Sequence, residues 1–171
     1  YLDELVFLLV PSDDAQVVRF KAGETDVISR LSAPNFAVLS GEASRARHLE
    51  DLGAGLDYTF LFFNLNDLDA SKLPDVARKQ AWFKQTAFRQ AVSAAIDRAG
   101  IVRLVYLGRA TPLAAHVTPG NRLWLNTALP RPQRSLARAR ELLARAGFAL
   151  ENGQLRDAKG TPVTFTIVTN A

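Results

Sequence analysis

The hydrophobic pattern opens with an apolar run at residues 5–10, which predicts a strand. Ser12 then supplies a helix N-cap, and two aspartates follow it where the helix dipole favours negative charge. Residues 15–24 predict a helix with Gly23 as its left-handed C-terminal residue. Residues 25–29 predict a second short strand. This strand, helix and strand order predicts a βαβ unit with a right-handed crossover.

The middle of the chain contains the strongest strand pattern. Residues 35–39 predict one short helix, and residues 56–66 combine aromatic, β-branched and apolar side chains at strand length. The polar, proline-containing stretch at residues 66–75 predicts a linker or an exposed loop.

The second half of the chain is predicted to be mainly helical. Apolar residues recur at helical spacing over residues 82–96 and again over residues 98–107, where Gly108 follows. A third helix begins near Ser135 and stops before Gly147. The remainder predicts a short strand, a turn and an alternating strand. That last strand covers residues 163–168.

Composition places the chain among soluble globular proteins. Of its 171 residues, 48% are hydrophobic and 22% are charged, and the chain contains no cysteine and no methionine. Disulfides and thiolate metal sites are therefore excluded. The net charge of +4 would suit a nucleic-acid partner. Much of the basic charge, however, lies at helical spacing in residues 131–147 without interleaved aromatic residues, so we expect no nucleic-acid binding.

The residues that carry chemistry do not form a catalytic pattern. His48 and His116 are the two histidines, and neither has the spacing of a metal ligand. No serine lies in a Gly-x-Ser-x-Gly turn, and Asp67 and Asp69 lie in a polar loop where carboxylates are normally solvated. We therefore predict recognition of a ligand, with no catalytic residue, metal or cofactor.

Several segments together resemble the family-5 extracellular solute-binding proteins, the peptide- and nickel-type receptors of bacterial ABC importers. They are YLDELVF, RFKAGETDVI, YTFLFFNLN, AFRQAVSAAIDRAGIVRLVYLGRATP, VTPG, ARELLARAGF and GTPVTFTIVTN. These segments follow the family's order and cover nearly the whole chain. The stretch FRQAVSAAIDR is the most specific of them.

The resemblance implies an α/β, type II periplasmic-binding-protein fold of two lobes that close over a ligand. Because family members are much longer, it also implies that this sequence is an internal piece with parts of both lobes. Residues 1–62 correspond to the end of the first lobe, residues 63–66 to the exit of a hinge strand, and residues 67–171 to the beginning of the second lobe.

Three residues are candidate ligand contacts. Phe63 and Asn64 lie where the hinge strand would leave the first lobe, beside the cleft. The alternative is that Phe62 and Phe63 belong to the core and that Asn64 satisfies backbone groups. Trp124 lies in an aperiodic loop, where it either contacts a ligand or folds back as a lid over its own lobe.

Three charged residues are assigned to helix architecture. Asp97 lies between two predicted helices and is placed to cap the second, and Arg98 begins that helix. Arg89 lies one turn into the preceding helix. All three are available for contacts with a ligand, but the pattern favours a structural helix joint.

The leading functional hypothesis is a substrate-binding component of an ABC transporter. It would capture a peptide or similar small solute and deliver it to a membrane permease. The resemblance implies a periplasmic or extracytoplasmic location, with membrane anchoring through a segment outside this sequence left open. The alternative is a hydrolase or other enzyme fragment whose catalytic residues lie outside this piece.

Overall fold

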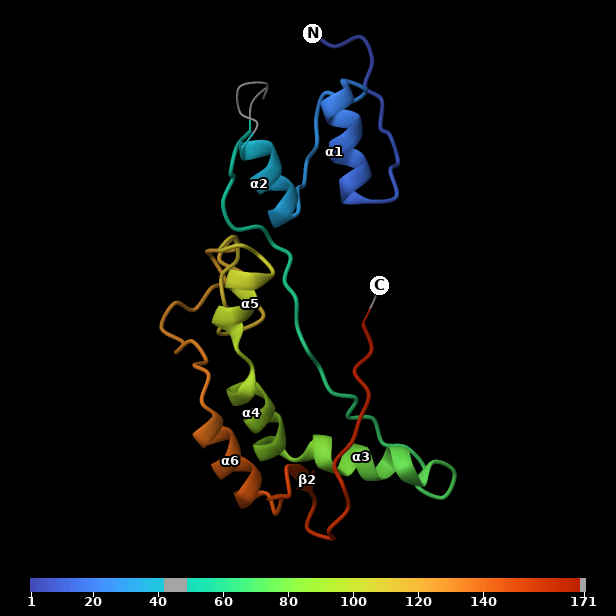
Figure 1. Cartoon of the computed structure of the whole chain (residues 1–171), viewed down its shortest axis with the longest axis vertical. Coiled ribbons are helices and arrows are strands. Elements are labelled where there is room, and N and C mark those ends of the chain that lie inside the picture. The colour runs from blue at the N-terminus through green and yellow to red at the C-terminus, as the bar shows by residue number, and fades with distance from the viewer. Residues whose placement is uncertain (42–48, 170–171) are drawn as a thin grey trace. The chain divides into compact units, whose positions relative to one another are not determined.

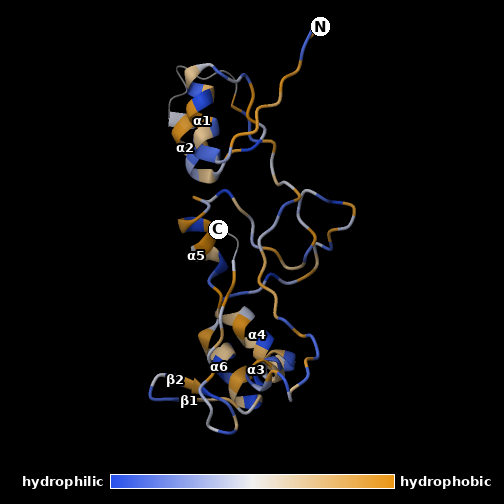
Figure 2. Cartoon of the chain, turned by 90° about the vertical axis from the view of Figure 1, so that its right-hand side faces the viewer, coloured by the Kyte–Doolittle hydropathy of each residue, from blue (hydrophilic) through white to orange (hydrophobic). Residues whose placement is uncertain are grey.

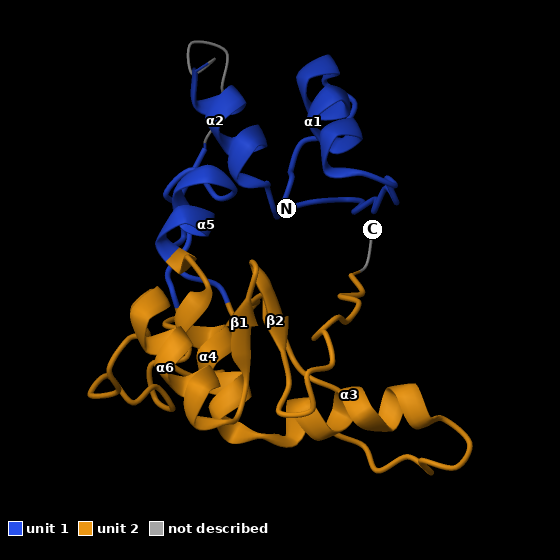
Figure 3. Cartoon of the chain, turned by 60° about the horizontal axis from the view of Figure 1, so that its bottom comes forward, with its two compact units in different colours: residues 1–55, 99–112 blue, residues 56–98, 113–171 orange. Residues whose placement is uncertain are grey.

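A computed structural model describes residues 1–41 and 49–169 (Figure 1). Six helices and two strands are described in these ranges, and they are α1 (Asp13–Ala22), α2 (Ala33–Gly41), α3 (Pro74–Lys84), α4 (Thr86–Ala95), α5 (Arg98–Leu104), α6 (Leu136–Arg145), β1 (Ala149–Glu151) and β2 (Gln154–Arg156). The chain divides into two compact units (Figure 3). The first unit comprises Tyr1–Gly55 and Ala99–Pro112, and the second comprises Leu56–Arg98 and Leu113–Ala171.

In the first unit, α1 has the predicted caps. The Ser12 hydroxyl accepts a hydrogen bond from the Ala15 amide, and Gly23 adopts the left-handed conformation with φ of 80°. The short helix predicted around residues 35–39 is confirmed as α2. The Asn35 side-chain amide donates to Asp14 Oδ1 at 2.9 Å, which joins α2 to the first turn of α1. Two predicted helices of this unit therefore meet through a polar contact.

The predicted βαβ unit is wrong for the described structure. Residues 5–10 and 25–29 form no regular strand, although α1 lies between them as expected. The apolar residues of the first segment are exposed, among them Leu5, Phe7 and Leu9, and Figure 2 shows hydrophobic positions along this N-terminal trace. A strand needs a neighbouring strand for its backbone hydrogen bonds, and no described segment pairs with this one.

In the second unit, the single helix predicted over residues 82–96 is two helices. The chain leaves helical geometry at Gln85, where φ is −70° and ψ is 116°. In addition, α3 begins at Pro74, inside the stretch that was predicted to be a loop. Proline is well tolerated at a first helical position because that residue needs no intrahelical donor.

An aromatic core joins these helices to the C-terminal hairpin. Trp82, Phe88 and Phe148 are buried, and Phe88 is only 1% exposed. Phe83 lies 6.0 Å from Phe88 between ring centroids. We call Phe83 and Phe88 the α3–α4 ring pair. This ring pair is the platform on which other segments of the second unit pack.

The last helix packs closely against α4. Ala91 of α4 lies buried with Ala139 and Leu142 of α6, so small side chains allow close approach of the two helices. The Ser135 hydroxyl accepts from the Arg138 amide, as the predicted N-cap requires. The Ser135 amide donates to the Ala94 carbonyl at 2.8 Å, which fixes the start of α6 against the end of α4.

The chain after α6 forms a short antiparallel hairpin rather than a larger sheet. β1 and β2 pair with Leu150 opposite Leu155, and an isolated antiparallel bridge joins Arg156 of β2 to Pro162 further along the chain. The strands predicted at residues 56–66 and 163–168 are not regular strands in the described structure. Both stretches run as extended traces without a hydrogen-bonded ladder (Figure 1).

Candidate functional site

Phe63 lies against the aromatic core of the second unit. Its ring centroid is 5.2 Å from that of Phe83 and 6.1 Å from that of Phe88. The side chain is partly buried by these contacts. The structure thus places Phe63 where the alternative interpretation expected it, in contact with the core, and its contact with a ligand stays a prediction.

The neighbouring Phe62 does not belong to the core, and that interpretation was wrong. Its side chain is 76% exposed. It continues a ladder of tilted rings along one side of the segment, with centroid distances of 5.4 Å from Tyr58 to Phe60 and 5.8 Å from Phe60 to Phe62. Alternation places Phe63 on the opposite side, as in a strand.

Asn64 stabilises a local turn. Its side-chain oxygen accepts a hydrogen bond from the Asn66 amide at 3.1 Å. This contact agrees with the interpretation that Asn64 satisfies backbone groups. The residue is also exposed. A role in ligand binding stays a prediction.

Trp124 lies on the surface of a turn. Its amide donates to the Asn121 carbonyl at 3.2 Å, while its side chain is 75% exposed. The ring therefore packs little against the described residues of the second unit. A contact with a ligand and a lid over its own lobe both stay predictions. Among the described residues no contact joins Trp124 to Phe63 or Asn64, so the structure does not gather the three candidates into one site.

Arg89 lies at the break between α3 and α4. Its guanidinium donates to the carbonyls of Phe83 and Lys84, both at 2.7 Å, and to the Thr86 hydroxyl at 3.1 Å. The carbonyls at a helix C-terminus have no intrahelical donor, and a guanidinium is well suited to satisfy them. These contacts support the architectural interpretation of Arg89.

Asp97 lies between α4 and α5, and Arg98 is the first residue of α5. Arg98 donates to the carbonyl and the hydroxyl of Ser93, at 2.8 and 3.0 Å, near the end of α4. Asp97 precedes α5 directly and forms an ion pair with Arg134 at 3.4 Å. That ion pair joins the helix joint to the loop before α6, and sequence reasoning missed it because the two residues are far apart in the chain.

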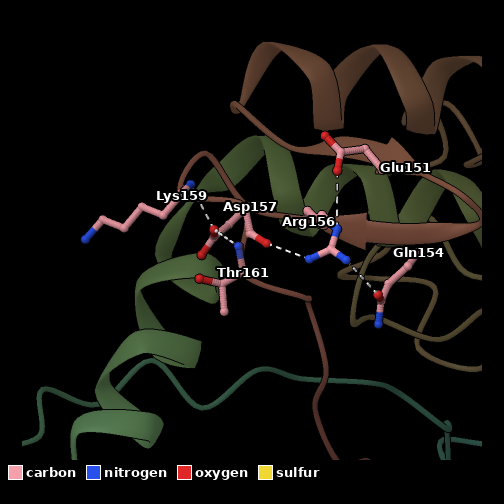
Figure 4. Close-up of polar contacts among 7 residues, drawn as sticks. Glu151, Gln154, Arg156, Asp157, Lys159 and Thr161 are labelled. Atoms are coloured by element: carbon pink, nitrogen blue, oxygen red, sulfur yellow. Dashed lines mark hydrogen bonds and ion pairs between the residues drawn. The ribbon is translucent and has the colours of Figure 1, made fainter.

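A polar cluster around Asp157 was also missed. Its Oδ1 accepts from the amides of Lys159 and Thr161, both at 2.9 Å, and its Oδ2 accepts from the Trp82 indole at 3.0 Å. Figure 4 shows the loop contacts together with Arg156, which donates to the Gly160 carbonyl at 2.7 Å. The carboxylate therefore fixes the turn after β2 and links it to α3.

Electrostatics at Asp157 favour the ionised carboxylate. Partial burial raises its pKa, but the hydrogen bonds from the Thr161 amide, the Trp82 indole and the Lys159 amide together lower it more. The net result is a pKa below the ordinary value of 3.8. Charge-assisted bonds of this kind are stronger than neutral ones. The only sequence signal for this cluster was the turn composition of the loop.

The other polar candidates that the structure describes lie on the surface. His116 is exposed, and His48 lies outside the described residues. Asp67 forms an ion pair with Lys84. The pKa of Asp69 is lowered by hydrogen bonds from the Ser71 hydroxyl and amide. Within residues 1–41 and 49–169, no three His, Asp or Glu side chains come together as metal ligands.

A shallow groove of about 280 Å³ lies between α4 and α6, and it contains none of the predicted ligand contacts. Gln90, Ser93, Gln133 and Arg138 line its polar side. Arg138 pairs with Glu141 at 2.7 Å and Ser93 with Arg98, so two of these groups already have partners.

Among the helices that the structure describes, no candidate for a membrane-spanning segment is found by length and hydropathy.

Comparison with known proteins gives the class to which these features belong. The sequence matches the family described as bacterial extracellular solute-binding proteins, family 5 (Middle), over residues 1–171. The chain therefore belongs to the family-5 bacterial extracellular solute-binding proteins. This membership implies the type II periplasmic-binding fold, and the described residues show mixed helices and a small sheet.

Two curated relatives are similar along the chain. A probable ABC transporter-binding protein of Deinococcus radiodurans is 27% identical over 177 residues, which covers 100% of this chain and 29% of the relative. The oligopeptide-binding protein AppA of Bacillus subtilis is 26% identical over 175 residues, covering 99% of this chain and 28% of the relative. The chain thus spans less than a third of the length of either relative. No solved structure matches it significantly.

Proposed function

We propose that this chain is part of the substrate-recognition component of an ABC importer, which captures a peptide or similar small solute without transforming it. The observation that carries the proposal is the family match along all of residues 1–171. The names of the two relatives, one an ABC transporter-binding protein and one an oligopeptide-binding protein, support it. Neither the family nor the relatives are described as enzymes.

In this proposal the whole protein works by closing two lobes over its solute. Residues 1–62 are assigned to the end of the first lobe, residues 63–66 to the exit of the hinge strand, and residues 67–171 to the beginning of the second lobe. Phe63, Asn64 and Trp124 are the proposed solute contacts. The exposed Trp124 ring supports this role most directly, because an aromatic side chain in water gains from being covered by a ligand.

The proposed location is periplasmic or otherwise extracytoplasmic, and the proposed partner is the membrane permease of the importer. The family description, which names extracellular proteins, supports this location. Anchoring through a segment outside this sequence belongs to the same proposal. The absence of cysteine is compatible with an oxidising compartment.

Calorimetry and mass spectrometry test the function together. A longer polypeptide that contains this sequence is purified without refolding, and any solute that accompanies it is identified by mass spectrometry. That solute is then titrated into the longer polypeptide and into residues 1–171. We expect saturable binding to the longer polypeptide and no tight binding to residues 1–171, because this chain holds only parts of the proposed lobes. Absence of binding to the longer polypeptide would contradict the function, and tight binding to residues 1–171 would contradict the lobe division.

A pair of matched variants tests the proposed contact at Trp124. In the longer polypeptide, Trp124→Ala is expected to weaken solute affinity at least about tenfold at an unchanged melting temperature. Leu123→Ala is the control, because Leu123 is a neighbour that is even more exposed and that we do not place in the site. Equal effects of the two substitutions would remove Trp124 from the proposed site.

A further inference from the structure

Charge is distributed unevenly along the chain. Between Asp97 and Glu141 lie 43 residues that include eight arginines and no aspartate, glutamate or lysine. At the chain's average of 17 acidic residues in 171, about four would be expected in a stretch of this length. The part of the stretch that belongs to the second unit, residues 113–140, contains five of the arginines, which are Arg122, Arg131, Arg134, Arg138 and Arg140.

Three of these five arginines have no acidic partner in the described structure. All five are exposed, and two of them form ion pairs, one with Asp97 and one with Glu141. Among the described residues, no ion pair includes the other three, which are Arg122, Arg131 and Arg140. A guanidinium that lies on the surface without a carboxylate can bind phosphate oxygens through two parallel hydrogen bonds.

Exposed leucines alternate with these arginines. Leu123 is 94% exposed, and Leu129 and Leu136 are 41% and 47% exposed. Each of these leucines lies within two residues of an arginine. The backbone of residues 122–135 forms turns but no helix or strand, and Figure 1 shows it as part of the orange trace that leads into α6. We call residues 122–140 the arginine–leucine segment.

This combination of side chains fits a membrane surface better than a protein surface. A bilayer with anionic lipids carries one sign of charge over its whole area, so it favours a segment that has cations and no carboxylates. Arginines at such a surface contact the phosphates, while leucines reach the boundary with the acyl chains. A protein partner is ordinarily held by apolar anchors that cluster at the centre of a packed interface, whereas these leucines are spread along the segment.

We propose that the arginine–leucine segment docks on the surface of a membrane that contains anionic phospholipids. The exposed arginines contact the lipid phosphates, and the leucines enter the boundary between headgroups and acyl chains. The contact is peripheral and reversible, because three leucines bury far less apolar area than a spanning helix does. In the proposed importer such docking keeps the protein close to its permease, but the contact itself is independent of which solute is bound.

Co-sedimentation with lipid vesicles tests the proposal. The longer polypeptide is prepared without lipid modification and is mixed with vesicles of equal parts phosphatidylglycerol and phosphatidylcholine, or of phosphatidylcholine alone. We expect binding to the anionic vesicles to be at least about tenfold stronger, and to weaken when the salt concentration is raised from about 0.1 M to about 1 M. Equal binding to the two kinds of vesicle, or binding to neither, would overturn the proposal.

A charge-matched pair of double variants locates the contact. Arg122→Gln with Arg131→Gln is expected to weaken binding to the anionic vesicles at least about tenfold. Lys72→Gln with Lys159→Gln is the control, because it removes two positive charges of the second unit outside the segment, and we expect less than about a threefold change. All four side chains are exposed and outside the helices, so we expect unchanged melting temperatures. Equal weakening by both variants would assign the attraction to net charge and would overturn the proposal.

The contribution of the leucines is tested at the most exposed of them. Leu123→Ala is expected to weaken binding to the anionic vesicles at least about threefold, because less apolar surface enters the bilayer. Thr127→Ala is the control, since Thr127 is an exposed polar residue of the same segment. Unchanged binding of Leu123→Ala would overturn the proposed entry of the leucines into the bilayer.

An acidic protein partner would give a different pattern. In that case the longer polypeptide would not bind the anionic vesicles, and it would bind vesicles of phosphatidylcholine only when they carry the permease. This result would overturn the proposal, because docking on lipid requires no protein in the bilayer.

Discussion

Two phenylalanines of the second unit show how differently its two kinds of segment are stabilised. Phe88 on α4 is 1% exposed and lies among aromatic rings of α3, the hairpin and the C-terminal segment, whereas Phe62 on the extended segment is 76% exposed. A helix satisfies its backbone within itself, so it needs only one apolar face to be covered. An extended segment needs neighbours for its backbone and for both faces. In the described structure the core face of α4 is therefore covered, whereas the extended segment keeps exposed apolar side chains and has no backbone ladder.

The largest predicted effect on stability is expected for a substitution of Phe88. We expect Phe88→Ala to lower the free energy of unfolding by about 3–5 kcal/mol, because it empties the centre of the ring cluster. Phe62→Ala is the matched control and is expected to change stability by less than about 0.5 kcal/mol in residues 1–171. Urea denaturation followed by circular dichroism measures both. Similar losses at the two positions would show that the helical and extended regions share one core.

The second prediction concerns the link between α3 and the hairpin turn. Trp82→Phe keeps an aromatic ring in the core but removes the indole donor to Asp157, and we expect it to cost about 2–3 kcal/mol. Thermal and urea unfolding at neutral pH measure this loss. A loss no larger than that of a surface substitution would show that the indole hydrogen bond does not stabilise the fold.

The Trp82→Phe difference should also depend on pH. Since the pKa of Asp157 in the folded state lies below 3.8, its ionised form stabilises the fold above that pH. This contribution is lost as the pH falls through the folded-state pKa. The stability difference between the wild type and Trp82→Phe is thus expected to be largest above pH 3.8 and to narrow as the pH falls below that value. A difference that stays constant would mean that the charge on Asp157 contributes nothing to the contact.

The boundaries of α1 and α6 were predictable because their signals are local. Ser12 and Ser135 cap α1 and α6 through amides three residues ahead, and Gly23 ends α1 with the expected left-handed geometry. The break at Gln85 was not predictable, since neither proline nor glycine marks it. There the Arg89 guanidinium satisfies two carbonyls at the end of α3, and this contact exists only once the helices have separated.

The strands and the polar cluster were harder to predict because they depend on distant partners. Residues 56–66 have a strand pattern, but a ladder needs a second segment, and the described residues supply none. The Trp82–Asp157 hydrogen bond joins positions 75 apart, a distance at which no sequence spacing is informative. For the candidate site, adjacency predicted that Phe63 and Asn64 lie together, whereas no pattern relates them to Trp124.

A smaller effect is expected at the joint between α4 and α5. Asp97→Ala is expected to cost on the order of 1 kcal/mol, because it removes a residue placed to cap α5. Its ion pair with Arg134 is half-exposed, so Arg134→Ala is expected to cost less than about 0.5 kcal/mol. A double-mutant cycle by urea denaturation separates the two contributions. If Asp97→Ala instead weakens solute binding by the longer polypeptide at an unchanged melting temperature, Asp97 is a binding residue and not an architectural one.

The smallest effect on stability is expected at Asn64, where the extended segment leaves the aromatic core. Asn64→Ala removes one exposed side-chain contact to the Asn66 amide, so we expect the free energy of unfolding to change by less than about 0.5 kcal/mol. Asn66→Ala is the control, because it keeps the Asn66 amide and therefore the turn. Calorimetric titration of the longer polypeptide then distinguishes the two interpretations of Asn64. A loss of solute affinity in Asn64→Ala alone supports a direct contact, whereas unchanged affinity in both variants leaves Asn64 as a residue that only stabilises the turn.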